Sequence, residues 1–499
     1  MKKGFHRSVP PWALCLLCAG AVLLLCSRSS PLYPTNDWGD ANTYFTVGRG
    51  ILDGLVPYRD LLDQKGPLLF FLHAGAALIS STSFWGVWLL EVAAGAGFLY
   101  CSLRSVQLFC PGRRTCLLML PLAAFVYSSS AFAQGDSAEE LCLPLLAFSL
   151  YCFLRAFQAG SSWRPSLGLF LLNGIAAGAV FWIKYTLLGL HFAFMASFAF
   201  LLWLADGSFK RAVQACAAFL GGMVLISLPV LLYFLYNHSL ADLFNVYFLT
   251  NFTAYSNVSP HWSVPFYNMA VSGLSTALAN PVWAALCIVG FLYCCVRRGV
   301  LCAAGRAALT GLVFFTGLFI WGGTMGWPYY GLPLACFAPL GFIPIVALLR
   351  EACAGRLCRQ AGAWAAALIA VFSMAFCYWT SPNISFMQVK KEDLVQTKFA
   401  RIIRQEGGQS LLNYGFLDGG FYLASEIMPS CRFFCRLNLQ NWQELEQPVR
   451  QLVKNSAFDF IITREEGPLY DMEGYELVCT EYQQYDGTVF PYSLFRKKN

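Results

Sequence analysis

Before residue 381, most carboxylate side chains that could act as bases lie in two short stretches of this chain. The first stretch follows the most N-terminal apolar segment and includes Asp40, and the second contains Asp136, Glu139 and Glu140. Acidic residues beside long apolar segments are costly unless they are paired, solvated or used, which makes them candidates for function. We interpret Asp40 and Glu139 as catalytic candidates, with Asp136 and Glu140 as substrate contacts beside them. The two stretches could supply a general base, a divalent metal site or both.

Three basic side chains near these acids are candidates for binding an anionic group. Lys65 precedes a Gly-Pro pair, Arg59 lies within a Pro-Tyr-Arg-Asp run, and Lys184 ends an otherwise apolar segment. An ammonium group in such a place needs an acidic partner or a phosphate. Two alternatives remain open. Lys184 could extend its ammonium to a membrane interface, and Arg59 could form a local salt bridge with Asp60.

Aromatic residues complete the set of candidate substrate contacts. Tyr58 lies beside Arg59, and Tyr329 and Tyr330 follow a Trp-Pro pair at the end of an apolar segment. Tyr and Trp are also common at such segment ends because membrane interfaces favour them. The histidines are dispersed without metal-ligand spacing. No nucleotide-binding motif has its required context, so nucleotide hydrolysis has no support and no cofactor other than a divalent metal is considered.

The composition indicates which kind of protein must position these side chains. Of 499 residues, 57% are hydrophobic and only 12% are charged, against about 25% charged in ordinary soluble domains. The composition therefore predicts a mainly α polytopic membrane protein and excludes a soluble multi-domain enzyme. The aromatic content of 16% excludes a disordered chain. The net charge of +7 fits membrane topology, and we predict no nucleic-acid partner.

Hydropathy predicts about 11 transmembrane helices, because a spanning helix needs roughly 20 mostly apolar residues. The segment 67–82 is apolar but shorter, and we interpret it as a helix at the outer interface. The predicted spans are 11–27, 83–105, 116–134, 139–157, 165–184, 185–205, 212–236, 276–296, 307–322, 331–349 and 361–380.

The positions of Lys and Arg predict the orientation of these spans. With the N-terminus and its basic residues Lys2, Lys3 and Arg7 inside, all five inner loops are basic. We therefore expect a multi-pass cell-membrane protein with a cytoplasmic N-terminus and an extracytoplasmic C-terminal tail. The inner loops carry Arg104, Arg113, Arg114, Arg155, Arg164, Lys210, Arg211, Arg297, Arg298, Arg306, Arg350, Arg356 and Arg359.

Four segments follow from this topology. We predict a transmembrane anchor at 1–27, a first extracytoplasmic loop with interfacial helices at 28–82, a transmembrane helical domain at 83–380 and a small α/β extracytoplasmic domain at 381–499. In the last of these, alternating patterns predict strands, and apolar residues at helical spacing predict helices. The predicted strands are 410–416, 432–437 and 458–464, with a terminal hairpin of 475–482 and 488–498 turning at Asp486-Gly487. The predicted helices are 393–405 and 441–455, the second capped by Asn441.

Three motifs resemble those of a known enzyme family. The stretch DWGDANTYFTVGRGILDGLVPYRDLLDQKGPLLFFLHA at 37–74 resembles the first outer loop of bacterial GT-C fold membrane glycosyltransferases. The similar branch is the family 39 group, protein-mannosyltransferase-like and aminoarabinose-transferase-like. GDSAEELCLP at 135–144 is similar to the family's T-E-E-x-x-L-P turn, and Pro328-Tyr329-Tyr330 with Pro333 resembles a late Y-x-x-P span start.

This resemblance implies a transfer reaction on the outer face of the membrane. The donor would be a hexose or pentose on a polyprenyl phosphate, and the acceptor a hydroxyl of a lipid, glycan or protein. Asp40 would be the base, and Lys65, Arg59 and Lys184 would bind the lipid phosphate. The alternative function is a non-enzymatic carrier or flippase for a lipid-linked glycan. Carriers often show repeats and midplane charges, whereas here the charges lie at the outer face and no repeat is visible.

Overall fold

The computed structural model describes residues 9–205, 207–255, 261–323, 326–353, 359–439, 445–485 and 487–498. The chain divides into two compact units, and each is described here by itself. The helical unit comprises residues 1–27, 90–228 and 259–384, and the mixed unit comprises residues 28–89, 229–258 and 385–499. The N-terminal basic residues, Arg356, Asn441 and Asp486 lie outside the described residues.

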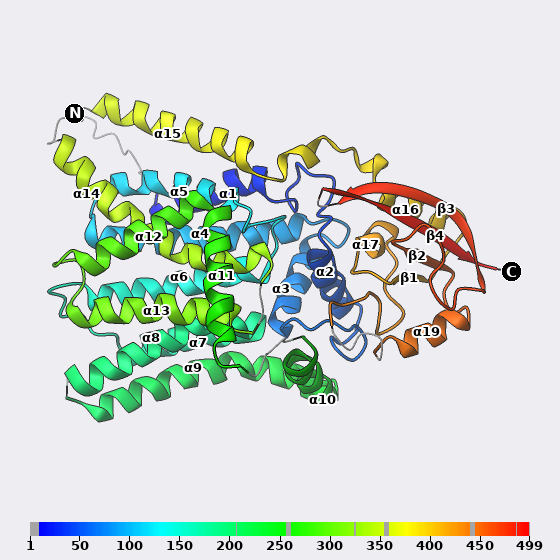
Figure 1. Cartoon of the computed structure of the whole chain (residues 1–499), viewed down its shortest axis with the longest axis horizontal. Coiled ribbons are helices and arrows are strands. Elements are labelled where there is room, and N and C mark those ends of the chain that lie inside the picture. Colours follow the sequence, from blue (N-terminus) through cyan, green and yellow to red (C-terminus); the bar gives the residue numbers. More distant parts are fainter. Residues whose placement is uncertain are drawn as a thin grey trace, which may run out of the picture. The chain divides into compact units, whose positions relative to one another are not determined.

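The helical unit is a bundle of apolar helices. Figure 1 shows α4, α6, α7 and α13 running in a common direction. The α-helices are α1 (Pro11–Cys26), α4 (Trp85–Phe109), α5 (Met119–Tyr127), α6 (Ala138–Phe157), α7 (Leu167–Lys184), α8 (Gly189–Phe200), α9 (Phe209–Tyr236), α11 (Val264–Ala279), α12 (Pro281–Val296), α13 (Ala303–Trp321), α14 (Phe342–Cys353) and α15 (Arg359–Thr380). The 3₁₀ helices are η1 (Arg113–Leu118), η2 (Tyr185–Leu187) and η5 (Pro328–Gly341), and η3 (Leu201–Ala205) is a π-helix.

The mainly α, membrane-spanning architecture is confirmed, but the count of eleven spans is not. Within the described residues, six helices are long and apolar enough to cross a membrane, or up to seven if one bent pair counts as a span. The remaining predicted spans are shorter helices or are interrupted. The six are Trp85–Phe109, Ala138–Phe157, Leu167–Leu187, Phe209–Tyr236, Ala303–Trp321 and Pro328–Arg350.

The predicted span 276–296 shows how an interruption arises. The chain bends by 118° between α11 and α12. Pro281 begins α12, and Asn280 before it has non-helical dihedrals (φ −132°, ψ 59°), since a following proline disfavours the helical region. The Asn280 side chain accepts hydrogen bonds from Ser130 Oγ at 2.9 Å and from the Ala131 N–H at 3.0 Å. A buried polar contact therefore stabilises the bend, and the hydropathy of the sequence cannot predict such a contact.

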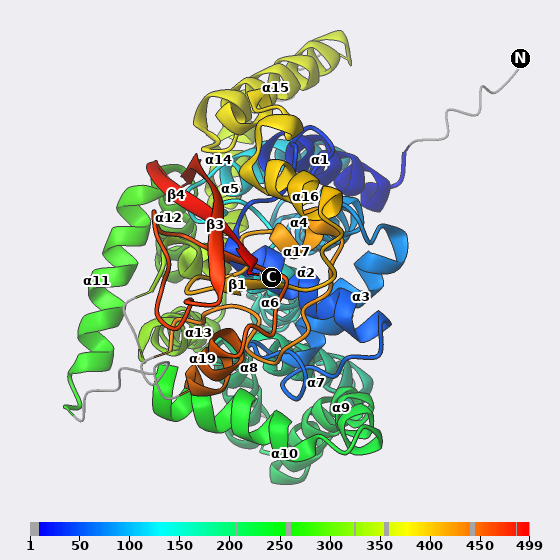
Figure 2. The same cartoon turned by 90° about the vertical axis from the view of Figure 1, so that its right-hand side faces the viewer.

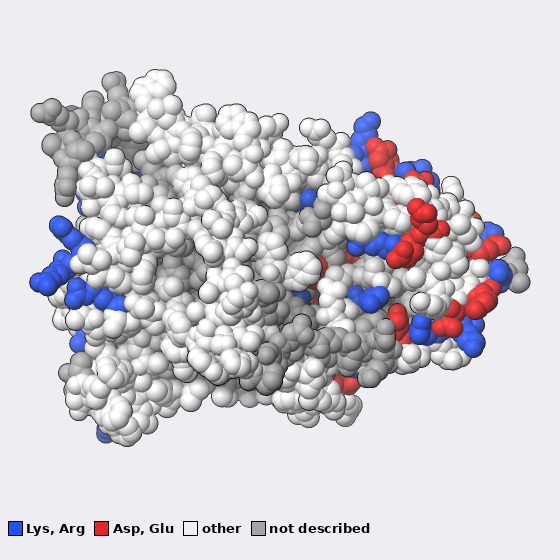
Figure 3. Space-filling model, in the orientation of Figure 1, with Lys and Arg blue, Asp and Glu red and all other residues white. Residues whose placement is uncertain are grey.

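Basic side chains gather at one end of the helical unit. At the left of Figure 3, Lys and Arg side chains are visible at the ends of the helices, and no Asp or Glu is seen among them in that view. Arg297 and Arg298 directly follow α12, Arg350 lies in the last turn of α14, and all three are exposed. This is the pattern that the charge distribution predicts for one membrane face.

The mixed unit joins the first loop to the C-terminal domain. Its helices are α2 (Gly39–Leu52), α3 (Pro67–Ile79), α10 (Leu240–Leu243), η4 (Phe244–Tyr255), η6 (Ile384–Gln388), η7 (Lys391–Asp393), α16 (Val395–Gln405), α17 (Phe421–Ser425) and α19 (Gln447–Lys454). Its strands β1 (Leu411–Tyr414), β2 (Phe460–Thr463), β3 (Tyr475–Tyr485) and β4 (Thr488–Lys497) form one sheet in the order β1-β2-β4-β3. β1 and β2 are parallel, and β4 pairs antiparallel with both β2 and β3.

Most of the secondary structure predicted for the tail is confirmed. The helix at 395–405, the strands at 411–414 and 460–463 and the terminal hairpin are present. The strand predicted at 432–437 is wrong. Phe434 and Cys435 are consecutive and both buried, so the segment does not alternate as a half-buried strand would. It makes isolated backbone hydrogen bonds instead, from Leu62 N to Arg432 O and from Arg436 N to Phe416 O.

Helices α2 and α3 pack backbone to backbone, and Figure 2 shows them side by side. A Cβ on Gly48 would lie 2.7 Å from the carbonyl carbon of His73 and 2.8 Å from the nitrogen of Ala74.

We expect Gly48→Ala to force the helices apart and to lower the free energy of unfolding by about 1–3 kcal/mol. Thermal unfolding in detergent measures this. Gly75, on α3, has open space at its Cβ and is the matched control. Gly75→Ala should be neutral or stabilise by about 0.5–1 kcal/mol, and an equal loss in both variants would contradict the account.

Candidate functional site

Helix α2 places Asp40 in its first turn, where the helix dipole favours a negative charge. Lys65 Nζ lies 3.2 Å from Asp40 Oδ2, and the Tyr44 hydroxyl donates a hydrogen bond to the same oxygen at 3.1 Å. Asp40 and Tyr44 are four residues apart and so share one face of the helix. Lys65 Nζ also lies 5.3 Å from the Tyr44 ring centroid, within the range of a cation–π contact. The side chains of Lys65 and Asp40 are only 10% and 16% exposed.

The loop before α3 is folded so that Lys65 is held in place. Tyr58 has a positive φ of 69° and is fully buried, and its hydroxyl donates to the Lys65 carbonyl oxygen at 2.6 Å. Asn251 fixes the adjacent residue by donating to the Gln64 carbonyl at 2.8 Å. These contacts make Tyr58 a residue that positions Lys65, and a direct contact between Tyr58 and substrate stays a prediction.

Arg59 forms the local salt bridge that the sequence left open as an alternative. Its guanidinium contacts the Asp60 carboxylate at 2.7 Å and donates to the Asn237 carbonyl at 3.0 Å. The hydrogen bonds from Arg59 and burial act in opposite directions on Asp60, and the net effect lowers the pKa of its carboxyl. Arg59 is exposed, so its role in binding a lipid phosphate stays a prediction.

Asp63 is buried in the same loop, whereas loop carboxylates are usually solvated. Its Oδ1 accepts from the Gln64 N–H at 2.7 Å, and its Oδ2 has no hydrogen-bond partner among the described residues. Burial raises the pKa of the Asp63 carboxyl from 3.8 to about 6; Lys65 opposes the rise and Asp40 adds to it. The carboxylate is therefore a source of pH-dependent instability.

We expect stability to fall as the pH rises from about 4 to 6, because there the folded state keeps a proton on Asp63 that the unfolded state has released. Above about pH 6 the loss is complete and amounts to about 3 kcal/mol. Asp63→Asn should flatten this part of the pH profile of thermal unfolding. Asp53→Asn, at an exposed position, is the control. Parallel profiles for wild type and Asp63→Asn would show that the buried carboxyl does not titrate in this window.

The helical unit contains a second buried ion pair. Lys184 Nζ at the end of α7 lies 2.5 Å from Glu139 Oε1 in the first turn of α6. The side chains are 12% and 1% exposed. The ammonium also lies 3.7 Å from the ring centroid of Tyr330 and 5.7 Å from that of Tyr329, both at the start of η5. Lys184 is thus buried in a polar and aromatic setting and does not extend into open solvent.

Glu139 keeps one oxygen available for another partner. Its Oε2 is buried and has no hydrogen-bond partner among the described residues. An unsatisfied buried carboxylate oxygen is costly, so natural structures rarely keep one without a reason. This oxygen is the atom through which Glu139 would receive a hydrogen bond from a substrate or a water molecule.

Asp136 and Glu140 shape the turn that presents Glu139. The Asp136 N–H lies 2.9 Å from both Glu140 Oε2 and Glu91 Oε1. Asp136 has a positive φ of 63°, and Ser137 caps α6 by accepting from the Glu140 N–H at 3.1 Å. Asp136, Glu140 and Glu91 are all buried. Their direct roles in substrate binding stay predictions, whereas their structural contacts account for the rigid turn.

Glu91 was not found among the candidates from sequence. It lies in α4, is fully buried, and accepts from Ser27 Oγ at 2.8–2.9 Å. The feature of the sequence that could have revealed Glu91 is a single carboxylate inside an apolar span, which often marks function. Counting motifs in the loops could not reveal it.

No metal centre is evident in the part of the chain that the structure describes. None of its His, Cys, Asp and Glu side chains form a group of three or more that could hold a metal ion. We therefore derive no step through a metal.

The structure brings the predicted residues together as two acid–lysine pairs. Asp40 pairs with Lys65 in the mixed unit, and Glu139 pairs with Lys184 in the helical unit. Each pair joins a predicted catalytic acid to a predicted phosphate-binding lysine. The prediction that Asp40 and Glu139 serve one reaction remains a prediction.

Comparison with known proteins identifies the fold. No protein-family model and no curated protein sequence matches the chain. Solved structures that are similar in fold include ArnT and an archaeal oligosaccharyltransferase, which are GT-C fold glycosyltransferases. The chain therefore has the GT-C fold, as the motifs in its sequence predicted.

The similarity extends over nearly the whole chain. ArnT from Cupriavidus metallidurans bound to undecaprenyl phosphate has a TM-score of 0.59 and 12% identity, covering 97% of this chain and 98% of ArnT. ArnT in the apo state gives 0.58 and 12%, covering 97% of each chain. The apo oligosaccharyltransferase of Archaeoglobus fulgidus gives 0.50 and 12%, covering 92% of this chain and 70% of that protein.

Proposed function

We propose that this protein is a membrane glycosyltransferase that moves a sugar from a polyprenyl-phosphate donor to an acceptor hydroxyl. The observation that carries the proposal is the partly buried Asp40–Lys65 pair with Tyr44, presented by α2 and the following loop of a GT-C fold. It joins a carboxylate that can accept a proton to a cation that can bind a phosphate. The undecaprenyl phosphate bound to ArnT supports a donor of this chemical class.

The pairing of acid and lysine suggests how donor binding prepares the base. While Lys65 contacts Asp40, the ammonium and the carboxylate hold each other in an ion pair. A donor phosphate arriving at Lys65 competes for that ammonium and weakens its hold on Asp40. The freed carboxylate then takes the proton of the acceptor hydroxyl. The acceptor oxygen bonds to the anomeric carbon as the bond from that carbon to the phosphate oxygen breaks, and polyprenyl phosphate leaves.

The site is proposed to work at the extracytoplasmic face. Support comes from the basic inner loops and from the basic end of the helical unit in Figure 3. On this topology the N-terminus is cytoplasmic and residues 381–499 are extracytoplasmic. A single cysteine placed near Arg113 should then react only with reagents that reach the cytoplasm.

A carrier or flippase for a lipid-linked glycan is the less supported alternative, since the fold is that of glycosyltransferases. The sugar moved is proposed to be a hexose or a pentose, and the acceptor a hydroxyl of a lipid, a glycan or a protein. Purified protein would be incubated with the lipid-linked sugars and acceptors extracted from the native envelope, and the products analysed by mass spectrometry. We expect one polyprenyl-phosphate sugar to be consumed while one acceptor gains the mass of that sugar. Intact donors after complete incubation would contradict the proposal.

A further inference from the structure

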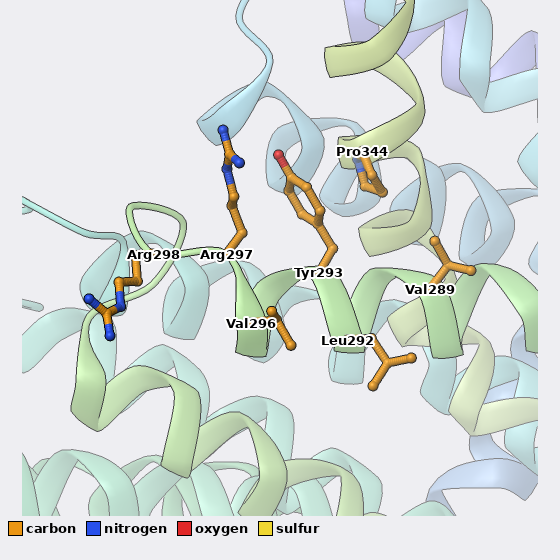
Figure 4. A pocket seen from close by; sticks show the side chains of 7 residues that line it. All are labelled: Val289, Leu292, Tyr293, Val296, Arg297, Arg298 and Pro344. Atoms are coloured by element: carbon orange, nitrogen blue, oxygen red, sulfur yellow. The ribbon is translucent and has the colours of Figure 1, made fainter.

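An open groove lies on the helical unit beside α12 and the first turn of α14. α12 packs backbone to backbone against the end of η5 at Gly290, since a Cβ there would collide with the backbone of Leu340 and Gly341. This close approach leaves no room for side chains at the contact itself. Val289 and Tyr293, toward the C-terminal end of α12, lie on the same side of this helix as Pro344, whereas Leu292 and Val296 project from its other side (Figure 4).

The groove has the size and the lining of a lipid site. Its volume is about 800 Å³, within the range of about 300–1,000 Å³ typical of ligand pockets. Four apolar side chains line it: Val289, Leu292, Val296 and Pro344. Leu292 and Val296 are 51% and 76% exposed, which is costly in water but not beside lipid. A hydrocarbon chain is therefore a better occupant of this part than a polar solute.

The end of the groove is positively charged. Arg297 and Arg298 follow the last residue of α12, line the groove and are exposed. Figure 4 shows the Arg297 guanidinium and the Tyr293 hydroxyl pointing to the same side of the helix, whereas Arg298 points to the other side. Two full positive charges outweigh the roughly half negative charge of a helix C-terminus. Arg297 and Tyr293 together supply hydrogen-bond donors, as a phosphate requires.

We propose that this groove is a binding site for an anionic phospholipid. One acyl chain lies between Val289 and Pro344, and the phosphate lies between the Arg297 guanidinium and the Tyr293 hydroxyl. Arg298 points to the other side of the helix and adds positive charge to this end of the groove without contacting the phosphate. Basic pockets between membrane helices bind anionic lipid head groups in this way. The inference is independent of the proposed transferase activity, because it uses none of the residues of the two acid–lysine pairs.

The test is native mass spectrometry of the purified full-length protein titrated with phosphatidylglycerol or with phosphatidylcholine of the same acyl chains. We expect the anionic lipid to bind at least about tenfold more tightly than the zwitterionic lipid. Arg297→Gln/Arg298→Gln should remove most of this preference. Lys210→Gln/Arg211→Gln removes the same charge from an exposed pair at the start of α9 and should keep it.

Two further experiments distinguish lipid binding in the groove from lipid binding to a charged surface. Val289→Trp fills the groove without changing its charge, and it should weaken binding of phosphatidylglycerol by a similar factor. Glycerol phosphate, which carries the head group without a chain, should not compete at equal concentration. The proposal is overturned if both arginine and lysine variants lose binding equally, if Val289→Trp binds like wild type, or if glycerol phosphate competes as well as the lipid.

Discussion

Asp40→Asn is expected to reduce turnover by about 10²–10⁴-fold while leaving the lipid donor bound, because the amide keeps the shape of the side chain but cannot take a proton. In the structure, the carboxylate receives contacts from Lys65 and Tyr44, and an amide oxygen can still accept from both. The loss should therefore appear in kcat, with the donor KM changed far less. Steady-state kinetics over a range of donor concentrations measure this directly.

Asp53→Asn is the matched control for this change. Asp53 lies at the C-terminal end of the same helix, is exposed, and is not part of either acid–lysine pair. We expect its kinetics to resemble those of wild type. If Asp40→Asn and Asp53→Asn turn over equally fast, Asp40 is not the base, and Asp37 or Asp136 becomes the next acid to test.

The second large effect is expected at the Glu139–Lys184 pair. Removing one partner of a buried ion pair leaves an uncompensated charge and typically costs about 3–5 kcal/mol. Lys184→Met leaves the buried Glu139 carboxylate without its cation, and Glu139→Gln leaves the Lys184 ammonium beside Tyr330 without its anion. Both single variants should unfold at distinctly lower temperature than wild type.

The double variant tests whether Glu139 and Lys184 stabilise the protein as an interacting pair or independently of each other. Glu139→Gln/Lys184→Met should lose less stability than the sum of the single losses, by about 0.5–3 kcal/mol, since neither charge is then left alone. Folded Lys184→Met protein should also show a higher apparent KM for the donor, if this ammonium contacts the donor phosphate. Strictly additive losses would contradict the ion pair, and an unchanged donor KM would leave Lys184 with a structural role only.

Asp40 and Lys65, which the sequence picked out as candidates, form an ion pair in the structure, and their catalytic and phosphate-binding roles stay predictions. Asp40, Tyr44 and Lys65 belong to one motif of 38 residues, at 37–74. A helix start and a short loop can bring residues so near in the chain together in only a few arrangements. The terminal hairpin was predicted for the same reason, since its strands are adjacent in sequence and pair in the expected order.

Features that depend on distant contacts were not predictable in this way. Glu91 lies within an apolar span and acquires its role only when α4 packs beside the turn at Asp136. The bend at Asn280 depends on a hydrogen bond with Ser130, 150 residues away. The segment 432–437 has the composition of a strand, but its backbone bonds to two separate loops. In each case tertiary contacts override the local pattern.

The central claim is that sugar transfer from a polyprenyl-phosphate donor releases polyprenyl phosphate. The most direct test is to reconstitute the purified protein in liposomes with the identified donor and acceptor, without nucleotide, and to count both products. We predict one free polyprenyl phosphate for each sugar bond formed, and neither product with Asp40→Asn. Movement of intact donor across the bilayer, with no polyprenyl phosphate released, would contradict the account and identify a carrier.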